Sequence, residues 1–257
     1  MLSLIKKELR QNWRSFRLPA LYLTLLFFSL ADPLTTKYMG QILQRFATGI
    51  TITMPPPSAA QAMGQFLGDI LEIGVFVIIA ITMGAVASEK GIGVATFILT
   101  KPVSRKAYVG AKLFVLSGGV ASGIALFTTL AYVYTWTLLG RAEPAGVILA
   151  ALSTLVYAEF ILAVTFASSM TLQSSLAAGG VGLLAFFLTM LVGSLLSRSS
   201  VGPYLPSTLA ANISSFLATP ANERAVFMFL RPGIVTLILS IAILVGGYGK
   251  FKREHLP

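Results

Sequence analysis

Apolar residues fill six long blocks of this 257-residue chain, and shorter polar segments separate the blocks. A helix that crosses a bilayer needs about 20 mostly apolar residues, because the hydrocarbon core is about 30 Å thick. The pattern therefore predicts an all-α membrane protein with six transmembrane helices. These are expected at residues 19–36, 70–87, 108–139, 146–170, 175–196 and 232–249. The third block exceeds one crossing, so that helix is expected to tilt or project.

A different pattern precedes the first block, in residues 1–17. Apolar side chains recur there at spacings of three and four, namely Leu2, Ile5, Leu9, Trp13 and Phe16. Lys and Arg fill much of the remaining helical surface. This combination is typical of an amphipathic helix that lies in the membrane interface, with its basic residues on anionic lipid. Residues 18–257 are then expected to form the transmembrane domain.

The charge distribution predicts an orientation. The chain has 19 Lys and Arg against 9 Asp and Glu, a formal net charge of +10. Thirteen of the basic residues lie in three clusters, at 6–17, 90–112 and 250–253, and all three flank apolar blocks. Basic residues beside membrane spans favour the cytoplasmic side. We therefore expect a protein of the cell membrane with both termini cytoplasmic, and with outer segments at 37–69 and 197–231.

Composition excludes several other classes of protein. Only 11% of the residues are charged, whereas soluble domains contain about 25%. The sequence has no cysteine and a single histidine, His255, so disulfides, thiolate metal sites and a Ser-His-Asp triad are not expected. We expect no metal site. Because the basic residues flank the spans, the partner predicted for them is the lipid bilayer and not nucleic acid.

The loop at residues 88–107 is both charged and amphipathic. Its charged residues are Glu89, Lys90, Lys101, Arg105 and Lys106, and its apolar stripe is Ile92, Ala95, Phe97, Ile98 and Leu99. An amphipathic helix in a cytoplasmic loop can dock into a groove of a partner. The alternative is an ordinary basic loop that only follows the orientation rule.

Several short motifs point to a known family. Glu89 and Gly93 precede the run Phe-Ile-Leu-Thr-Lys-Pro-Val-Ser-Arg at 97–105, and Lys112 opens the third span. These residues resemble the first cytoplasmic loop of the permease subunits of ABC transporters of the ABC-2 exporter family. The segments Lys-Lys-Glu-Leu-Arg at 6–10 and Phe-Ala-Ser-Ser at 166–169 also look like that family. Val94 departs from it, because the family often has threonine there.

The resemblance implies that the loop is a coupling helix on a separate ATPase subunit. The docking residues it implies are Glu89, Lys90, Gly93, Phe97, Thr100, Pro102, Arg105 and Lys106. It also implies two ATPase subunits and a second permease subunit, identical or homologous. The chain has no Gly-x-x-x-x-Gly-Lys-Ser/Thr phosphate loop. We therefore expect no enzymatic activity and no bound cofactor in this chain, with ATP and Mg on the partner ATPase.

Three acidic residues are candidates for a substrate path. Glu159 lies near the middle of the fourth block, where a carboxyl group is costly and usually faces the bundle interior. Asp69 and Glu72 lie three residues apart, so they are expected to share a helix face at the outer end of the second span. The alternatives are that Glu159 only fixes packing and that the pair is solvated. Asp32, which precedes Pro33, is expected to mark the end of the first span.

Small residues predict close helix packing. Gly119 and Gly123 form a stripe on the third span, and Gly179, Gly180 and Gly182 form another on the fifth. Such stripes let helices approach, either inside the protomer or at a dimer interface. Residues 207–217, in the last outer segment, are expected to form a short external or re-entrant helix.

Three functions remain open at this point. The first is the permease subunit of an ATP-driven ABC exporter, which forms the substrate path as a dimer. The second is a secondary transporter coupled to protons through Glu159. The third is a sensory or anchor subunit of an ABC complex that transports nothing.

Overall fold

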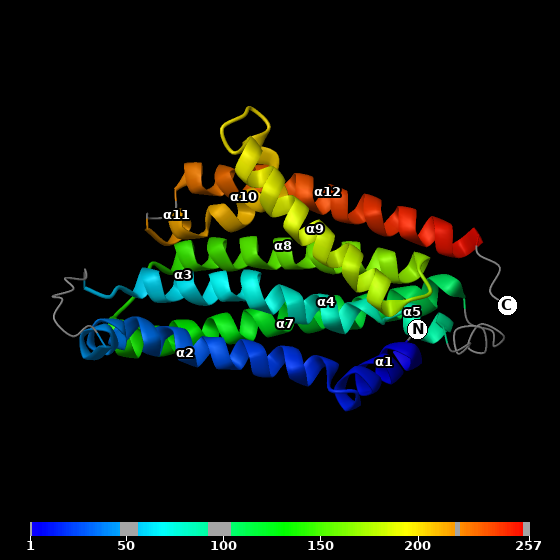
Figure 1. Cartoon of the computed structure of the whole chain (residues 1–257), viewed down its shortest axis with the longest axis horizontal. Helices are drawn as coiled ribbons and strands as arrows, with labels where there is room; N and C mark the ends of the chain where they lie inside the picture. The colour runs from blue at the N-terminus through cyan, green and yellow to red at the C-terminus, as the bar shows by residue number, and fades with distance from the viewer. Residues whose placement is uncertain (1, 47–55, 92–103, 219–221, 254–257) are drawn as a thin grey trace.

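The computed structural model describes residues 2–46, 56–91, 104–218 and 222–253, and nearly all of them are helical (Figure 1). The α-helices are α1 (Leu2–Arg14), α2 (Arg17–Phe46), α3 (Ala59–Asp69), α4 (Val75–Met83), α5 (Ala87–Gly91), α7 (Arg105–Leu139), α8 (Pro144–Thr171), α9 (Ser175–Leu196), α10 (Pro206–Ala211), α11 (Ile213–Ala218) and α12 (Glu223–Arg253). A π-helix, η1 (Ile70–Gly74), joins α3 to α4, and a 3-10 turn, η2 (Gly202–Tyr204), precedes α10.

Six helical stretches are long and apolar enough to cross a membrane. They are Arg17–Arg45, Ala59–Gly91, Arg105–Leu139, Pro144–Thr171, Ser175–Leu196 and Glu223–Arg253. Within the described ranges no strand occurs. The predicted all-α fold with six spans is therefore confirmed. Helix α1 and the last turn of α12 lie at the same end of the bundle, which we call the termini end; the opposite end is the far end (Figure 1).

Several helices extend beyond the apolar blocks that predicted them. α2 continues to Phe46 and α3 begins at Ala59, so much of the expected outer segment 37–69 is helical. The apolar pattern ends where polar residues begin, but residues such as Gln and Leu sustain a helix whether or not they are in lipid. α12 likewise begins at Glu223, nine residues before Pro232. The expected helix at 207–217 is present as two short helices, α10 and α11.

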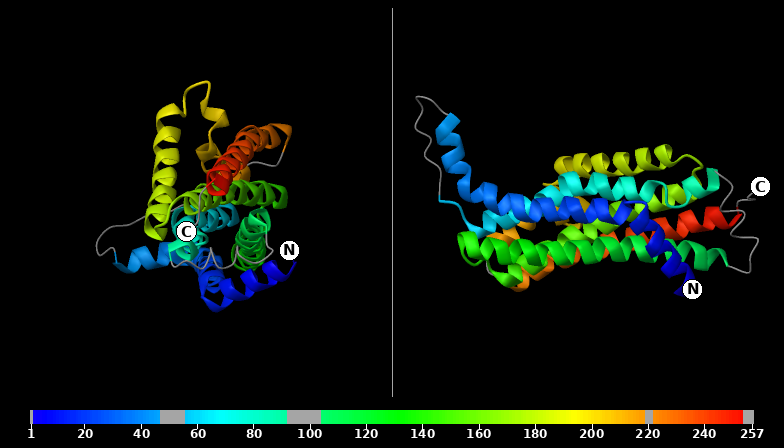
Figure 2. Two further views of the ribbon diagram at one scale, coloured as in Figure 1. Left: turned by 90° about the vertical axis from the view of Figure 1, so that its right-hand side faces the viewer. Right: turned by 90° about the horizontal axis from the view of Figure 1, so that it is seen from below.

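The expectation that Asp32 marks the end of the first span is wrong. Asp32 and Pro33 both lie inside α2. Proline removes one backbone hydrogen bond, which bends a helix without ending it when the neighbouring helices support both halves. α2 does bend, and its C-terminal part leaves the bundle (Figure 2).

Helix α8 lies at the centre of the bundle. Buried residues occur on all of its sides, and it packs against α4, α7, α9, α11 and α12. A helix that is apolar all round is buried. By contrast α9 and α12 expose apolar side chains such as Leu184, Phe187 and Ile238, which lipid can cover. Figure 2 shows α9 standing at one side of the bundle.

The glycine stripes mostly serve packing inside the chain. A Cβ atom on Gly123 would lie 3.0 Å from Leu25 on α2 and 3.1 Å from Tyr22. Gly119 faces Leu18 on the same helix. On α9, Gly179 faces Met83 and Gly182 faces Thr165, whereas Gly180 faces open space.

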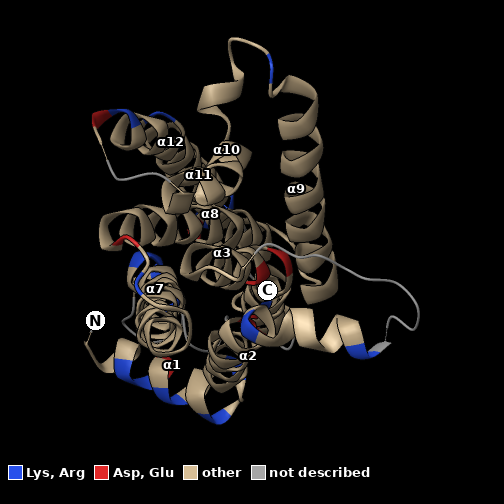
Figure 3. Cartoon of the chain, turned by 90° about the vertical axis from the view of Figure 1, so that its left-hand side faces the viewer, with Lys and Arg blue, Asp and Glu red and all other residues tan. Residues whose placement is uncertain are grey.

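Helix α1 turns two polar residues toward the bundle and exposes most of its apolar and basic side chains. Glu8 and Asn12, one turn apart, are buried, whereas Leu9 and Trp13 are about half exposed. Lys and Arg line the side of α1 that faces away from the bundle (Figure 3). Exposed apolar and basic side chains are compatible with a position in the membrane interface.

Candidate functional site at the termini end

The second span bends just before it reaches the termini end. α4 ends at Met83, and α5 begins at Ala87 after a short turn. Ser169 on α8 fixes this turn, because its Oγ accepts hydrogen bonds from the N–H groups of Val86 and Ala87, each at 3.0 Å. The turn therefore holds α5 against α8 and directs Glu89 toward α7.

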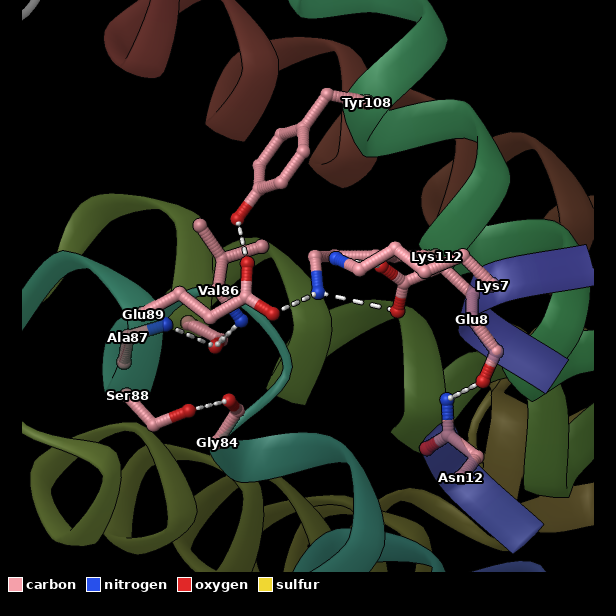
Figure 4. Close-up of polar contacts among 11 residues, drawn as sticks. Lys7, Glu8, Asn12, Gly84, Val86, Ala87, Ser88, Glu89, Tyr108 and Lys112 are labelled. Carbon is pink, nitrogen blue, oxygen red and sulfur yellow. Dashed lines mark hydrogen bonds and ion pairs between the residues drawn. The ribbon is translucent and has the colours of Figure 1, made fainter. Parts of the chain in front are cut away.

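The carboxylate of Glu89 is buried between α5 and α7, with only 6% of the residue exposed. Tyr108 donates its hydroxyl hydrogen to Oε2 at 2.5 Å, and Lys112 Nζ donates to Oε1 at 2.8 Å (Figure 4). Tyr108 and Lys112 lie one turn apart on α7, so they share one helix face. Two donors on one helix thus hold both oxygens of the carboxylate.

Lys112 also binds the N-terminal helix. Its Nζ donates to Oε2 of Glu8 at 3.1 Å, and the side chains of both residues are almost completely buried. Lys7 Nζ lies 3.3 Å from the other carboxylate oxygen of Glu8. We call Glu8, Glu89, Tyr108 and Lys112 the buried charge network. Such an arrangement is stable only while all its members stay in place, because a lost partner leaves an uncompensated buried charge.

Two basic residues beside the network connect to other helices. Lys90 Nζ donates to the backbone carbonyl of Met170 in the last turn of α8, at 3.1 Å. The guanidinium of Arg105 donates to the carbonyls of Phe251 and Lys252 in the last turn of α12, at 3.1 and 3.0 Å. A cation is favourable at this position, because the carbonyls of a helix C-terminus carry partial negative charge. The two flanks of segment 92–103 are therefore both fixed to the bundle.

The predicted docking residues fall into two groups. Gly93, Phe97, Thr100 and Pro102 lie outside the described residues. Of the others, Lys106 is exposed on the first turn of α7. Glu89 is buried and bound inside the chain, and Lys90 and Arg105 bind backbone carbonyls of other helices. These three residues therefore position the flanks of the loop within the chain.

Sequence reasoning placed Glu8 and Ser169 in segments that resemble the family, at 6–10 and 166–169, but did not assign either residue to this site. A signal for Glu8 exists, because it is the one acidic residue among the first 31 and lies in a basic helix. The signal for Ser169 is weaker, since serine is common in membrane helices. Its role depends on a turn that the sequence pattern does not mark.

The pair Asp69 and Glu72 does not share one environment. Asp69 ends α3 and is half-buried, whereas Glu72 lies in the π-helix η1 and is exposed. The π-helix adds a residue to the turn, so the face predicted from ordinary helical spacing shifts. The side chain of Asp69 faces that of Asp32 on α2 instead.

Glu159 lies near the middle of α8, as the sequence predicts. Its Oε1 is buried and has no hydrogen-bond partner among the described residues. Ser117 on α7 lies beside the same carboxyl group. A polar atom of this kind in a membrane helix marks a candidate functional position.

A cavity of about 1090 Å³ opens at the far end between α9, α10 and α12. Its lining combines apolar side chains, such as Met190 and Phe227, with charged ones, Glu223, Arg224 and Arg231. A space of this size and mixed character can hold an amphipathic molecule.

The six long apolar helices define the chain as a multi-pass membrane protein. No protein-family model matches the sequence. The chain is similar to the uncharacterized transmembrane protein YxlG of Bacillus subtilis (strain 168), with 31% identity over 137 residues. The matched region covers 52% of this chain and 53% of the relative, so the chain spans about half the length of the curated relative it matches.

Proposed function

We propose that the chain is the membrane-spanning permease subunit of an ATP-driven exporter of the ABC-2 type. The observation that supports this best is the attachment of both flanks of segment 92–103. Glu89 on one flank binds Lys112 on the other, and Arg105 binds the end of α12. A force on the segment would therefore reach the second, third and sixth spans together.

In this proposal the loop docks on a separate ATPase subunit. The start of α7 is well defined for such a contact, because the Ser104 Oγ accepts a hydrogen bond from the Ala107 N–H at 3.2 Å and caps the helix. Two ATPase subunits would bind ATP and Mg, and a second permease subunit, identical or homologous, would complete the path. This chain would make and break no bonds. It would act through the different affinities of its conformations for cargo.

The proposal places the termini end in the cytoplasm. Four exposed basic residues lie at that end: Lys6 and Arg10 on α1, Lys106 in the first turn of α7, and Lys250 in the last turn of α12. Basic residues beside spans favour the cytoplasmic side. The cavity between α9 and α12 would then lie toward the outside, as the release end of the path.

The first experiment is a detergent pull-down of the tagged full-length chain from its native membrane, with partners identified by mass spectrometry. We expect an ATPase to co-purify with the wild type. Lys106→Glu should reduce the recovery of the ATPase at least tenfold, because it reverses an exposed charge beside the proposed docking loop. Lys106 does not belong to the buried charge network, so this substitution leaves that network intact. Lys250→Glu reverses another exposed charge at the same end and should leave recovery unchanged. Recovery of no ATPase with the wild type, beside a control complex that stays intact, would reject the proposal.

A second candidate function rests on Glu159. Its buried, unpartnered oxygen also suits a proton-coupled transporter that needs no ATPase. That function predicts proton-driven flux in proteoliposomes containing this chain alone, and loss of flux in Glu159→Gln. ATP hydrolysis by a co-purified complex without any flux would instead favour the sensory or anchor role.

A further inference from the structure

Two carboxyl groups meet between α2 and α3, in the half of the bundle nearer the far end. Asp32 lies about 22 Å along α2 from Arg17, at 1.5 Å per residue. It is only 3% exposed, and its Oδ2 has no hydrogen-bond partner within the described residues. The side chain of Asp69, at the end of α3, lies within hydrogen-bonding reach of the Asp32 carboxyl group.

The way α2 and α3 are aligned also places Asp32 beside Asp69. α2 and α3 run in opposite directions, and Thr36 Oγ1 donates to Gln65 Oε1 at 3.1 Å. Thr36 lies four residues after Asp32, and Gln65 lies four residues before Asp69. One helical turn separates Thr36 from Asp32 and Gln65 from Asp69. The two aspartates therefore face each other one turn closer to the termini end than the Thr36–Gln65 contact.

The described part of the chain supplies no nearby positive charge. Helix α4 has no charged residue, and η1 adds only the acidic Glu72. The basic residues of α1 and α7 belong to the termini end. Lys37 lies five residues from Asp32 and therefore points to a different side of α2; its Nζ lies 5.7 Å from the ring of Tyr38. Buried carboxylates without a compensating charge are very unfavourable.

Each aspartate also adjoins an irregular piece of helix. Pro33 follows Asp32, and because proline has no N–H, the carbonyl of the fully buried Ser29 loses its usual helical donor. The π-helix Ile70–Gly74 begins directly after Asp69. Interrupted membrane helices expose carbonyl oxygens, which together with carboxylates coordinate cations in transporters.

From this arrangement we propose that Asp32 and Asp69 bind one alkali-metal cation, with the Ser29 carbonyl as a further ligand. The ligands are hard oxygen atoms, which suit such ions. A proton shared between the two carboxyl groups would satisfy only their mutual contact. A metal ion, by contrast, can contact oxygen atoms of both carboxyl groups and a backbone carbonyl at once. Protons compete for the same oxygens, so lower pH weakens the binding. The proposal requires no partner ATPase, and its test is separate from that of the proposed function.

The test is the thermal unfolding midpoint, Tm, of the purified full-length chain at pH 8 in NaCl, KCl or choline chloride of equal ionic strength. We expect NaCl or KCl to raise Tm by about 3 °C or more once the ion exceeds its Kd tenfold, with a saturating dose dependence. Asp32→Asn and Asp69→Asn should each abolish the shift. Glu72→Gln, which neutralises the exposed carboxyl group in η1, should retain it.

Three results would overturn this proposal. The first is a wild-type Tm that is the same in all three salts. The second is a Tm that depends on pH and not on the alkali ion, which would leave a proton-sharing pair. The third is an ion-specific shift that survives both aspartate substitutions. If Asp32→Asn fails to fold, the half-buried Asp69→Asn alone decides the outcome.

Discussion

At the scale of single residues, Lys112 holds together two carboxylates from distant parts of the chain. Its ammonium lies 2.8 Å from Glu89 and 3.1 Å from Glu8, and all three side chains are buried. Lys7 contacts the same Glu8 carboxylate at 3.3 Å, but 45% of its side chain is exposed. The two lysines thus have the same charge and share one partner, and they differ in burial.

Replacing Lys112 should therefore destabilise the fold far more than replacing Lys7. Lys112→Met leaves two buried carboxylates without their shared cation, and we expect a loss of about 3–5 kcal/mol in the free energy of unfolding. Lys7→Met should cost no more than about 1 kcal/mol, because solvent already screens that contact. Denaturant unfolding of both variants in detergent gives the comparison. Equal losses would show that the network contributes no more than a surface ion pair.

At the scale of the elements, close helix contacts at the far end depend on glycine. A Cβ atom on Gly146, in the first turn of α8, would collide with the backbone carbonyl of Phe216 on α11. A backbone atom cannot move aside as a flexible side chain can. Gly180 on α9 offers the opposite case, because a Cβ atom there meets nothing within 4 Å.

These two glycines should respond in opposite ways to alanine. Gly146→Ala must push α11 away from α8, and we expect it to destabilise the fold by about 1–3 kcal/mol. Gly180→Ala should be neutral or stabilising by up to about 1 kcal/mol, because alanine favours the helix and loses less entropy on folding. The Tm values of the two variants, measured side by side, check this. Similar losses in both would contradict the contact between α8 and α11.

At the scale of the whole molecule, the apolar pattern was enough to predict the six spans, because each block has the length that a bilayer requires. It was not enough for their ends, since α2 continues to Phe46 through a mixed polar and apolar segment that includes Gly40. Contacts between residues far apart in the chain could not be predicted from the sequence either. Periodicity shows which residues share one helix face, but it cannot show that Glu8 meets Lys112 or that Asp32 meets Asp69. The π-helix after Asp69 changes the local repeat, so the predicted pairing with Glu72 was misplaced.

The contact between Glu8 and Lys112 joins residues 104 positions apart, and this sets an order of events during synthesis. A ribosome adds about 5–20 residues per second, so Lys112 is made about 5–20 s after Glu8. Until the third span has entered the membrane, the Glu8 carboxylate can pair with its neighbour Lys7 but not with Lys112. In that interval the exposed apolar and basic side chains of α1 can hold that helix at the lipid surface. Lys112 can thus fix α1 in place only after the three spans that follow α1 have been made.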